Sequence, residues 1–367
     1  MTINNEHKKL NVPNLRFPEF QGEWAKCTLN EVCKFHNGRA YKQTELLAAG
    51  KYRVLRVGNF FTNDSWYYSN LELEDNKYAQ NGDLLYAWSA SFGPRFWREE
   101  KVIFHYHIWK IDSFKNVDKN FLYHFLDLDS AKIKNEVQGG TMVHITKGDM
   151  KKRTISYPSV PEQRNIARFL FLLDERIATQ NKIIDKLQSL IKGIAQNIVR
   201  NNKPNVRLSE CLECKSSTLQ ESDVCEQGTY PVYGANGIVG YLDNYNTEGE
   251  AVYIIKDGSG VGTVSYVTGK CSASGTLNTL QAKEGYSLQY LYYLLKVFNF
   301  EPYKTGMAIP HIYFKDYGKA KVFCPSYTEQ LQYARLLSAI DNKLSIEQNI
   351  LTELSLQKQY LLHQMFI

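Results

Sequence analysis

The residues of this 367-residue sequence that could do chemistry are mainly cations interleaved with aromatic rings. In the first half, three arginines and two lysines alternate with tyrosines from Arg39 to Arg56, and a second basic cluster runs from Lys147 to Arg153. Lys and Arg side chains hold phosphates, whereas amides and aromatic rings can address bases. The pattern therefore favours contact with nucleic acid. A solvated charged surface is the alternative for either cluster taken alone.

The sequence shows no signature of catalysis. Gly269-Lys270 is followed by Cys271, so no Walker A motif stands there. The glycine-rich loop from Asp257 to Gly262 lacks the third glycine spacing of a dinucleotide-binding motif and lies between two strand-like runs. No two prolines are adjacent, which removes the Pro-Pro motif with which amino-methyltransferases hold a flipped base. No combination of nucleophile, base and orienting group can be named, so we expect a non-catalytic protein.

Cysteine usage, charge and hydropathy narrow the class further. Seven scattered cysteines make no disulfide framework, and Cys211 and Cys214 form only half of a zinc site, so free thiols in a reducing compartment are expected. The net charge of +6 is mild, which means that DNA binding must come from local clustering. No apolar run approaches the ~20 residues that cross a bilayer, and the N-terminus lacks the apolar core of a secretion signal. We expect a soluble, cytoplasmic protein without a metal.

The chain contains an internal repeat at an offset of 167 residues. Thirteen of the 42 positions from Gly139 to Gln180 recur as the identical residue, where chance would give about two or three. The same offset pairs Tyr86 with Tyr253, which carries the repeat into the middle of each half. The thirteen pairs are Gly139/Gly306, His144/His311, Ile145/Ile312, Asp149/Asp316, Lys152/Lys319, Pro158/Pro325, Ser159/Ser326, Glu162/Glu329, Gln163/Gln330, Ala167/Ala334, Arg168/Arg335, Leu170/Leu337 and Asp174/Asp341.

Each half ends in a long helical pattern, over residues 161–199 and 328–366. Apolar residues recur there with 4-3 heptad spacing, which is typical of a coiled-coil seam. A helix of this length spans ~58 Å and needs a partner, and the simplest partner is the other helix. The alternative is that each helix covers a separate domain core.

The heptad gaps predict how the helices meet. Gln180 and Glu347 interrupt the two seams, lie at the helix centres and are related by the repeat offset, so only an antiparallel pair brings them together. Lys358 is a second polar intrusion in the later helix. The same register predicts the facing pairs Leu173 with Leu354, Leu187 with Ile340 and Ile166 with Leu361.

The segments before the long helices are expected to be mixed α/β. Runs at 52–57, 101–110, 251–255 and 262–267 look like strands, and helices are expected at 121–136 and 288–298. The predicted fold is therefore α/β (mixed α+β), with two similar domains and two long antiparallel helices. The expected boundaries are 1–158 for the first domain, 159–203 for the first long helix, 204–326 for the second domain and 327–367 for the second long helix.

The sequence resembles a known family through the following motifs. The runs Gly139-Gly-Thr-Met-Val-His-Ile-Thr-Lys-Gly-Asp-Met-Lys151, Pro161-Glu-Gln163 and Asp174-Glu-Arg-Ile177 are similar to the end of a target recognition domain and the start of the first conserved helix in type I restriction-modification specificity subunits. Tyr230-Pro-Val-Tyr-Gly-Ala-Asn-Gly-Ile238 is similar to the opening of a second recognition domain. The resemblance covers residues 15–366, with one departure, Tyr327-Thr328 in place of Val160-Pro161.

The resemblance implies a non-catalytic, sequence-specific DNA-binding subunit. Each recognition domain would read one half of a bipartite target in double-stranded DNA, while the helices set the spacing and dock two methylation subunits. Restriction subunits would join through the methylation subunits, and S-adenosylmethionine, ATP and magnesium would belong to those partners, with no cofactor in this chain. The competing hypotheses are a stand-alone DNA-binding protein, an autonomous methyltransferase and a coiled-coil scaffold.

Base contacts are expected from polar residues in loops and at strand ends, where hydrogen-bonding groups can meet base edges. In the first domain the candidates are Arg39, Lys42, Arg56, Asn59, Ser91, Arg95, Thr141 and His144. In the second domain they are Tyr233, Asn236, Lys256, Asp257, Ser259, Asn278 and His311.

Overall fold

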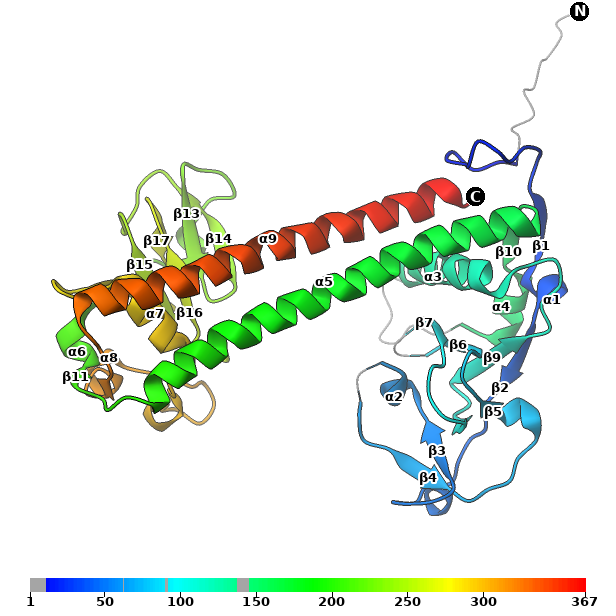
Figure 1. The fold of residues 1–367 in the computed structure, drawn as a ribbon, viewed down its shortest axis with the longest axis horizontal. Coiled ribbons are helices and arrows are strands. Elements are labelled where there is room, and N and C mark those ends of the chain that lie inside the picture. Colours follow the sequence, from blue (N-terminus) through cyan, green and yellow to red (C-terminus); the bar gives the residue numbers. More distant parts are fainter. Residues whose placement is uncertain (1–10, 62, 90–91, 137–144) are drawn as a thin grey trace, which may run out of the picture. The chain divides into compact units, whose positions relative to one another are not determined.

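The computed structural model describes residues 11–61, 63–89, 92–136 and 145–367 (Figure 1). The chain forms two compact units, which divide both long helices between them. Unit 1 comprises Met1–Ala178 and Thr352–Ile367, and unit 2 comprises Thr179–Leu351. Each unit therefore contains one mixed α/β domain together with a segment of each long helix. Among the described residues, no helix combines the length and the apolar character needed to span a bilayer.

Unit 1 is built from two four-stranded sheets and one strand pair. The sheets have the orders β2-β9-β6-β7 and β4-β3-β8-β5, and β1 pairs with β10. The four residues of β6 are fully buried, as expected for a central strand covered on both faces. The elements, with η for a 3-10 helix, are β1 (Ala25–Thr28), α1 (Leu29–Val32), β2 (Lys34–Asn37), η1 (Gln43–Glu45), β3 (Tyr52–Leu55), α2 (Val57–Phe61), β4 (Tyr67–Ser69), η2 (Asp75–Lys77), β5 (Tyr78–Ala79), β6 (Leu84–Ala87), β7 (Gly93–Phe96), β8 (Val102–Phe104), β9 (Ile108–Asp112), α3 (Lys119–Glu136), α4 (Lys147–Lys152) and β10 (Thr154–Tyr157).

Unit 2 repeats this plan. Its sheets have the orders β12-β18-β15-β16 and β14-β13-β17, and β11 pairs with β19. The parallel pair β13/β17 corresponds to the parallel pair β3/β8 of unit 1. The elements are β11 (Val206–Arg207), α6 (Leu208–Cys211), β12 (Leu212–Ser216), η3 (Glu221–Asp223), β13 (Tyr230–Gly234), β14 (Gly237–Leu242), β15 (Ala251–Ile255), β16 (Val264–Val267), β17 (Ser272–Ala273), β18 (Leu277–Ala282), α7 (Leu288–Val297), η4 (Glu301–Tyr303), α8 (Phe314–Tyr317) and β19 (Lys321–Val322).

One strand prediction is wrong. The run at 101–110, read from the sequence as a single strand, is divided into β8 and β9, which belong to different sheets. His105 ends the first strand because its backbone bridges to Arg39, and the amide of Ile108 then donates to the carbonyl of His105 at 3.0 Å, which closes a turn. Residues 105–107 are therefore a turn at a sheet edge.

The helical patterns at 161–199 and 328–366 are confirmed within one residue at each end. They are α5 (Val160–Arg200) and α9 (Tyr327–Met365), and they run side by side (Figure 1). The first part of α5 shares unit 1 with the end of α9, and its last part shares unit 2 with most of α9, which makes the pair antiparallel. The seam is apolar in both units: Ile166 and Leu361 lie in one hydrophobic cluster, and Leu187 and Ile340 in another. Leu173 and Leu354 are also buried.

The predicted meeting of the heptad gaps is confirmed. Gln180 Nε2 donates to the backbone carbonyl of Glu347 at 2.9 Å and to the Glu347 carboxylate. Both residues are buried, and Lys343 Nζ pairs with Glu347 Oε1 at 2.5 Å. The seam therefore contains one polar layer within unit 2.

Buried glutamines tie each long helix to the domain helix beside it. Gln163 Oε1 accepts the amide of Asp118 at 2.6 Å, just before α3 begins, and its amide group donates to Pro158 O at 2.8 Å. Gln330 repeats this, since it accepts the amide of Ser287 at 2.9 Å, just before α7, and donates to Pro325 O at 2.9 Å. These bonds explain why the glutamine recurs in both halves, and they make the starts of α3 and α7 equivalent.

Candidate nucleic-acid interface

In unit 1, Trp88 connects three loop segments. Its backbone amide donates to His107 O at 3.1 Å, and its indole Nε1 donates to Tyr106 O at 2.8 Å. Its carbonyl accepts the amide of Ile145 at 3.4 Å. The residue after β6, the turn at 105–107 and the segment entering α4 are thereby held together at one edge of the sheet.

Unit 2 has the same backbone frame with other side chains. The amide of Lys256 donates to Thr276 O at 3.0 Å, and its carbonyl accepts the amide of Ile312 at 2.9 Å. Ile312 is the repeat counterpart of Ile145, so Lys256 takes the place of Trp88 and Thr276 that of His107. The two units therefore share the backbone hydrogen bonds of this loop framework, whereas the side chains that the framework carries differ.

Arg39 and Arg56 converge on the turn at 105–107. The amide of Tyr106 donates to Arg39 O at 3.1 Å, and the Arg39 guanidinium pairs with Glu45 through bonds of 2.7 and 3.0 Å. The Arg56 guanidinium lies 4.3 Å from the centre of the Tyr67 ring. Burial, together with His107 and Arg56, lowers the pKa of His105 to about 4, so His105 is neutral at pH 7. Lys42 is exposed at the start of η1.

The other described candidates of unit 1 lie around α2. Arg95 is exposed on β7, and its guanidinium lies 4.6 Å from the centre of the Phe61 ring. The side-chain amide of Asn59 donates to Asn63 O at 2.8 Å and to Ser65 O at 2.7 Å, so this group holds its own loop. Ser91, Thr141 and His144 lie outside the described residues.

In unit 2, three candidates form one charged cluster. Asp257 Oδ1 lies 2.7 Å from His311 Nδ1, and its other carboxylate oxygen pairs with Lys256 Nζ. Burial raises the pKa of Asp257, but its contacts with His311 and Lys256 outweigh that effect and hold the pKa below its usual value. A carboxylate that stays ionised can accept hydrogen bonds from the amino groups of cytosine or adenine.

The backbone places His311 beside Asp257. Thr305 and His311 exchange backbone hydrogen bonds of 2.9 and 2.7 Å, which closes the turn between them. Gly306 has a φ of +87°, and a side-chain carbon there would collide with the carbonyl oxygen of Ile309. Only glycine suits this turn without strain, which accounts for Gly306 in the repeat motif.

The remaining candidates of unit 2 differ in exposure. Ser259 follows Asp257 and is exposed, and Asn236 is exposed in the turn between β13 and β14. Tyr233 is half-buried, and its carbonyl accepts the amide of Ser274 at 2.8 Å, which brings β13 to the loop that holds Thr276.

Asn278 does not fit the prediction that it contacts a base. It lies inside β18, is 4% exposed, and accepts a hydrogen bond from Ser216 Oγ at 2.8 Å. Its position in the chain suggested a strand end, whereas strand pairing places it beneath the surface. We therefore withdraw Asn278 from the candidate set.

The sequence reasoning missed Trp88, Tyr106 and Thr276. Tyr106 is exposed, and its ring centroid lies 6.2 Å from that of Trp88, so the pair presents aromatic surface beside the Arg39 backbone. The signal was available: His-Tyr-His interrupts the alternation of an otherwise strand-like run. Because aromatic faces stack on bases or contact the thymine methyl group, this turn can contribute to DNA recognition.

The second basic cluster is only partly available for binding. Lys152 is exposed at the end of α4, whereas Arg153 is turned inward and pairs with Asp129 at 2.6 Å. Burial also lowers the pKa of Lys147. This cluster therefore offers fewer phosphate contacts than its composition suggests.

Metal ligation finds no support in the part of the chain that the structure describes. No group of three His, Cys, Asp or Glu residues there is placed to hold a metal ion. Cys211 Sγ contacts Cys324 Sγ at 3.9 Å, and all seven cysteines are free thiols.

Comparison with known proteins gives the family. The model of the type I restriction modification DNA specificity domain matches twice, at residues 21–189 and 202–356. A putative type I specificity subunit of Mycoplasma genitalium is 26% identical over 278 residues, which cover 68% of this chain and 71% of that protein. The EcoBI specificity subunit of Escherichia coli is 21% identical over 203 residues, covering 54% and 43%.

Solved structures share the fold. The type I restriction-modification S subunit from M. genitalium gives a TM-score of 0.67 at 19% identity and covers 97% of this chain and 99% of its own. A second structure, solved in work on the structural basis of complex assembly and conformational transition of the type I R-M system, gives a TM-score of 0.53 at 16% identity. The match covers 92% of this chain and 96% of that one. With two matches of the family model that together span most of its length, this chain belongs to the type I restriction-modification DNA specificity family.

Proposed function

We propose that this protein is the DNA-recognition subunit of a type I restriction-modification complex, in which each unit reads one half of a bipartite target. The observation that carries the proposal is the shared frame around Trp88 and Lys256, which presents different side chains in the two units. Two similar frameworks with different contact residues suit a target whose two halves differ in sequence.

The contact residues we propose for unit 2 are Tyr233, Asn236, Lys256, Asp257, Ser259, Thr276 and His311. For unit 1 they are Lys42, Trp88, Arg95 and Tyr106, with Arg56 beside them. Arg39 and Asn59 are already held by Glu45 and by neighbouring carbonyl groups, so they support the surface rather than read bases. Ser91, Thr141 and His144 remain predictions from the sequence.

The long helices are the proposed docking site for two methylation subunits. Both helices carry large apolar side chains that face solvent, which is a composition typical of a protein interface. These residues are Leu172, Ile183, Leu190 and Val199 on α5 and Tyr327, Leu336, Ile346, Leu356 and Tyr360 on α9. Restriction subunits would bind through the methylation subunits. S-adenosylmethionine, ATP and magnesium would enter with those partners, this chain would be non-catalytic, and the complex would act in the cytoplasm.

A methylation assay tests the proposal. The full chain is combined with the methylation subunits of its host, and methylated positions are mapped on DNA of random sequence. We expect one bipartite motif that appears only when this chain is present. Tight sequence-specific binding by the chain alone, without support of methylation, would favour a stand-alone DNA-binding protein. Absence of any salt-dependent DNA affinity in both states would favour a scaffold.

A further inference from the structure

The end of each long helix packs on a different unit, and the two ends are repeat counterparts. Residues 352–365 at the end of α9 belong to unit 1, and the corresponding residues 185–198 of α5 belong to unit 2. Their seam positions are apolar in both, as in Leu354 and Leu187, with one exception. Where α5 has Ile191, α9 has Lys358.

In unit 1, Lys358 is held between two carboxylates. Its Nζ lies 2.7 Å from Asp174 Oδ1 on α5 and 3.5 Å from Asp127 Oδ2 on α3. The lysine side chain is only 17% exposed, and the second oxygen of Asp174 is buried without a hydrogen bond among the described residues. Lys358 is therefore the cation that pairs with the half-buried Asp174 and, at longer range, with the more exposed Asp127.

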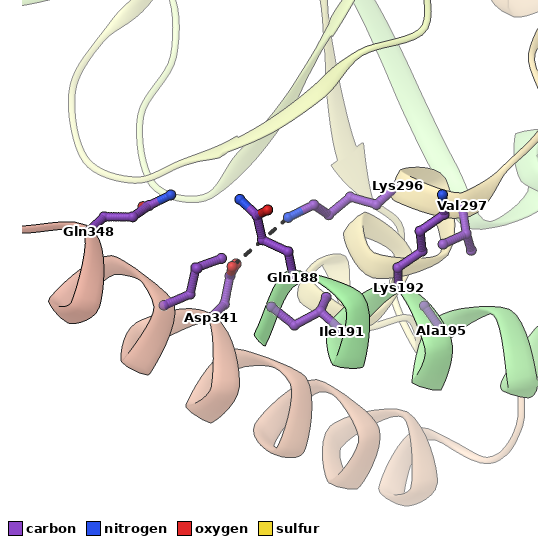
Figure 2. Close-up of a pocket in the computed structure, with 9 residues that line it drawn as sticks. Gln188, Ile191, Lys192, Ala195, Lys296, Val297, Asp341 and Gln348 are labelled. Carbon is purple, nitrogen blue, oxygen red and sulfur yellow. Dashed lines mark ion pairs between the residues drawn. The ribbon is translucent and has the colours of Figure 1, made fainter. Parts of the chain in front are cut away.

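In unit 2, the cation that pairs with the equivalent carboxylate lies on another helix. Asp341, the counterpart of Asp174, lies 4.0 Å from Lys296 Nζ on α7 and accepts the hydroxyl of Tyr293 at 3.2 Å. Figure 2 shows Lys296 directed toward Asp341, with Ile191 on the neighbouring helix. These residues line a cavity of about 460 Å³ at the junction of α5, α7 and α9.

Lys296 is the structural counterpart of Asp127. The glutamine bonds make Asp118 and Ser287 equivalent, and each of the two charged residues follows nine positions later. The two units therefore differ in the charges that face the helix end packed on them. In unit 1, two carboxylates face a lysine of α9. In unit 2, a carboxylate and a lysine face an isoleucine of α5.

We propose that these contacts make unit 1 selective for the end of α9 and unit 2 selective for the end of α5, so that the two halves pair with each other rather than with the same half of a second copy. An α5 end on unit 1 would leave Asp127 and Asp174 against an isoleucine. An α9 end on unit 2 would bring Lys358 against Lys296. Charge arrangements that penalise the wrong partner are a common source of pairing specificity between similar helices.

The fluorescence of the full chain gives a probe of unit 1 alone. All five tryptophans, at positions 24, 66, 88, 97 and 109, lie in unit 1. K358I gives α9 the seam residue of α5, and D127K gives α3 the charge of α7. The double variant D127K/K358I rebuilds the arrangement of unit 2. Denaturant unfolding followed by tryptophan emission then measures each arrangement at equilibrium.

We expect each single variant to lower the folding equilibrium constant of unit 1 by roughly 10- to 100-fold, since a buried charge loses its partner or meets a like charge. The double variant should return to within about 3-fold of the wild type. Q357I, at an exposed neighbouring position, is the control and should change the constant less than about 2-fold. If K358I does not fold, K358M replaces it in the same cycle. Additive losses in the double variant, or an equal loss in Q357I, would overturn the proposal.

Two further measurements separate charge pairing from packing. The groups that face Lys358 are Asp127, Tyr123 and His124 on α3 and Asp174 on α5. In K358I the unpaired carboxylates bind protons more tightly in the folded state, so the loss should be larger near pH 8 than near pH 5. In unit 2, I191K should destabilise the chain and I191K/K296D should recover it, as followed by circular dichroism. A loss of stability that does not depend on pH, or no recovery in unit 2, would mean that the cluster acts through packing and not through charge pairing.

Discussion

Gln180 of α5 donates a hydrogen bond to the backbone carbonyl of Glu347 of α9, and the two residues stand 167 positions apart. That separation equals the repeat offset, so each residue contacts its own counterpart in the other half. In an antiparallel pair, counterparts meet at one level of the seam only, which fixes the register. Register has consequences for DNA because a shift of one heptad would move a helix by ~10 Å, about three base pairs of rise.

The first prediction concerns this polar layer. E347L removes the acceptor and leaves the buried Gln180 amide group without its carboxylate partner, so the midpoint of urea unfolding should fall. Q180L/E347L replaces both polar groups by apolar ones and should recover the midpoint or exceed it. A double variant as unstable as E347L would show that the layer acts through packing rather than hydrogen bonding.

The second prediction is a pH dependence at the same layer. Hydrogen bonds from Lys343 and Gln180 lower the pKa of Glu347. A carboxylate with a lowered folded-state pKa stabilises the fold above its unfolded pKa of about 4.3, and that contribution is lost as the pH falls through the folded value. Wild type should therefore be more stable than E347Q at pH 7, and the difference should disappear toward pH 3. A difference that stays constant over this range would contradict the assignment.

The third prediction concerns the buried glutamines. Q163L leaves the amide of Asp118 and two carbonyl groups without partners, and Q330L does the same at Ser287 and Pro325. Each change should cost about 2 to 4 kcal/mol of unfolding free energy, whereas Q357L at an exposed site should cost less than ~0.5 kcal/mol. Tryptophan emission should report Q163L directly. Losses no larger than that of Q357L would mean that these bonds do not anchor the helix starts.

The fourth prediction addresses base recognition. D257N keeps the size of the side chain and changes an acceptor-only group into one that also donates, so it should relax or alter specificity at one position in one half of the target. The cost at that position should be ~1 to 3 kcal/mol. K152A removes an exposed cation and should weaken binding of all sequences alike. Binding selection on a randomised target distinguishes the two patterns, and equal weakening by D257N would make Asp257 a supporting residue.

The long helices could be predicted from local sequence patterns. The features that the sequence did not predict depend on long-range packing. Heptad spacing is a property of neighbouring residues, so the ends of α5 and α9 were found within one residue, and the repeat offset predicted the contact of Gln180 with Glu347. The break at His105 depends on pairing with Arg39, 66 positions away, which no local window contains. Lys358 likewise read as a polar intrusion, because its two carboxylate partners come from helices distant in sequence.

The sequence also anticipated some of the contacts at the candidate site, while base contact by these residues stays a prediction. Lys256, Asp257 and His311 were predicted as polar loop or strand-end residues, of which only His311 belongs to the repeat motif, and the structure brings them into contact. Asn278 was wrongly predicted to contact a base because the exposure of a side chain depends on which strand covers it. Trp88 was missed as a site residue because it acts through backbone hydrogen bonds to two loops.

The central claim, that each unit reads one half of a bipartite target, is tested most directly by exchanging one domain. Residues 1–158 are replaced by the equivalent domain of a specificity subunit with a different target, and the methylated motif is mapped with the same methylation subunits. The account predicts that one half of the motif changes to that of the donor, while the other half and the spacing stay the same. A change in both halves, or in neither, would contradict it.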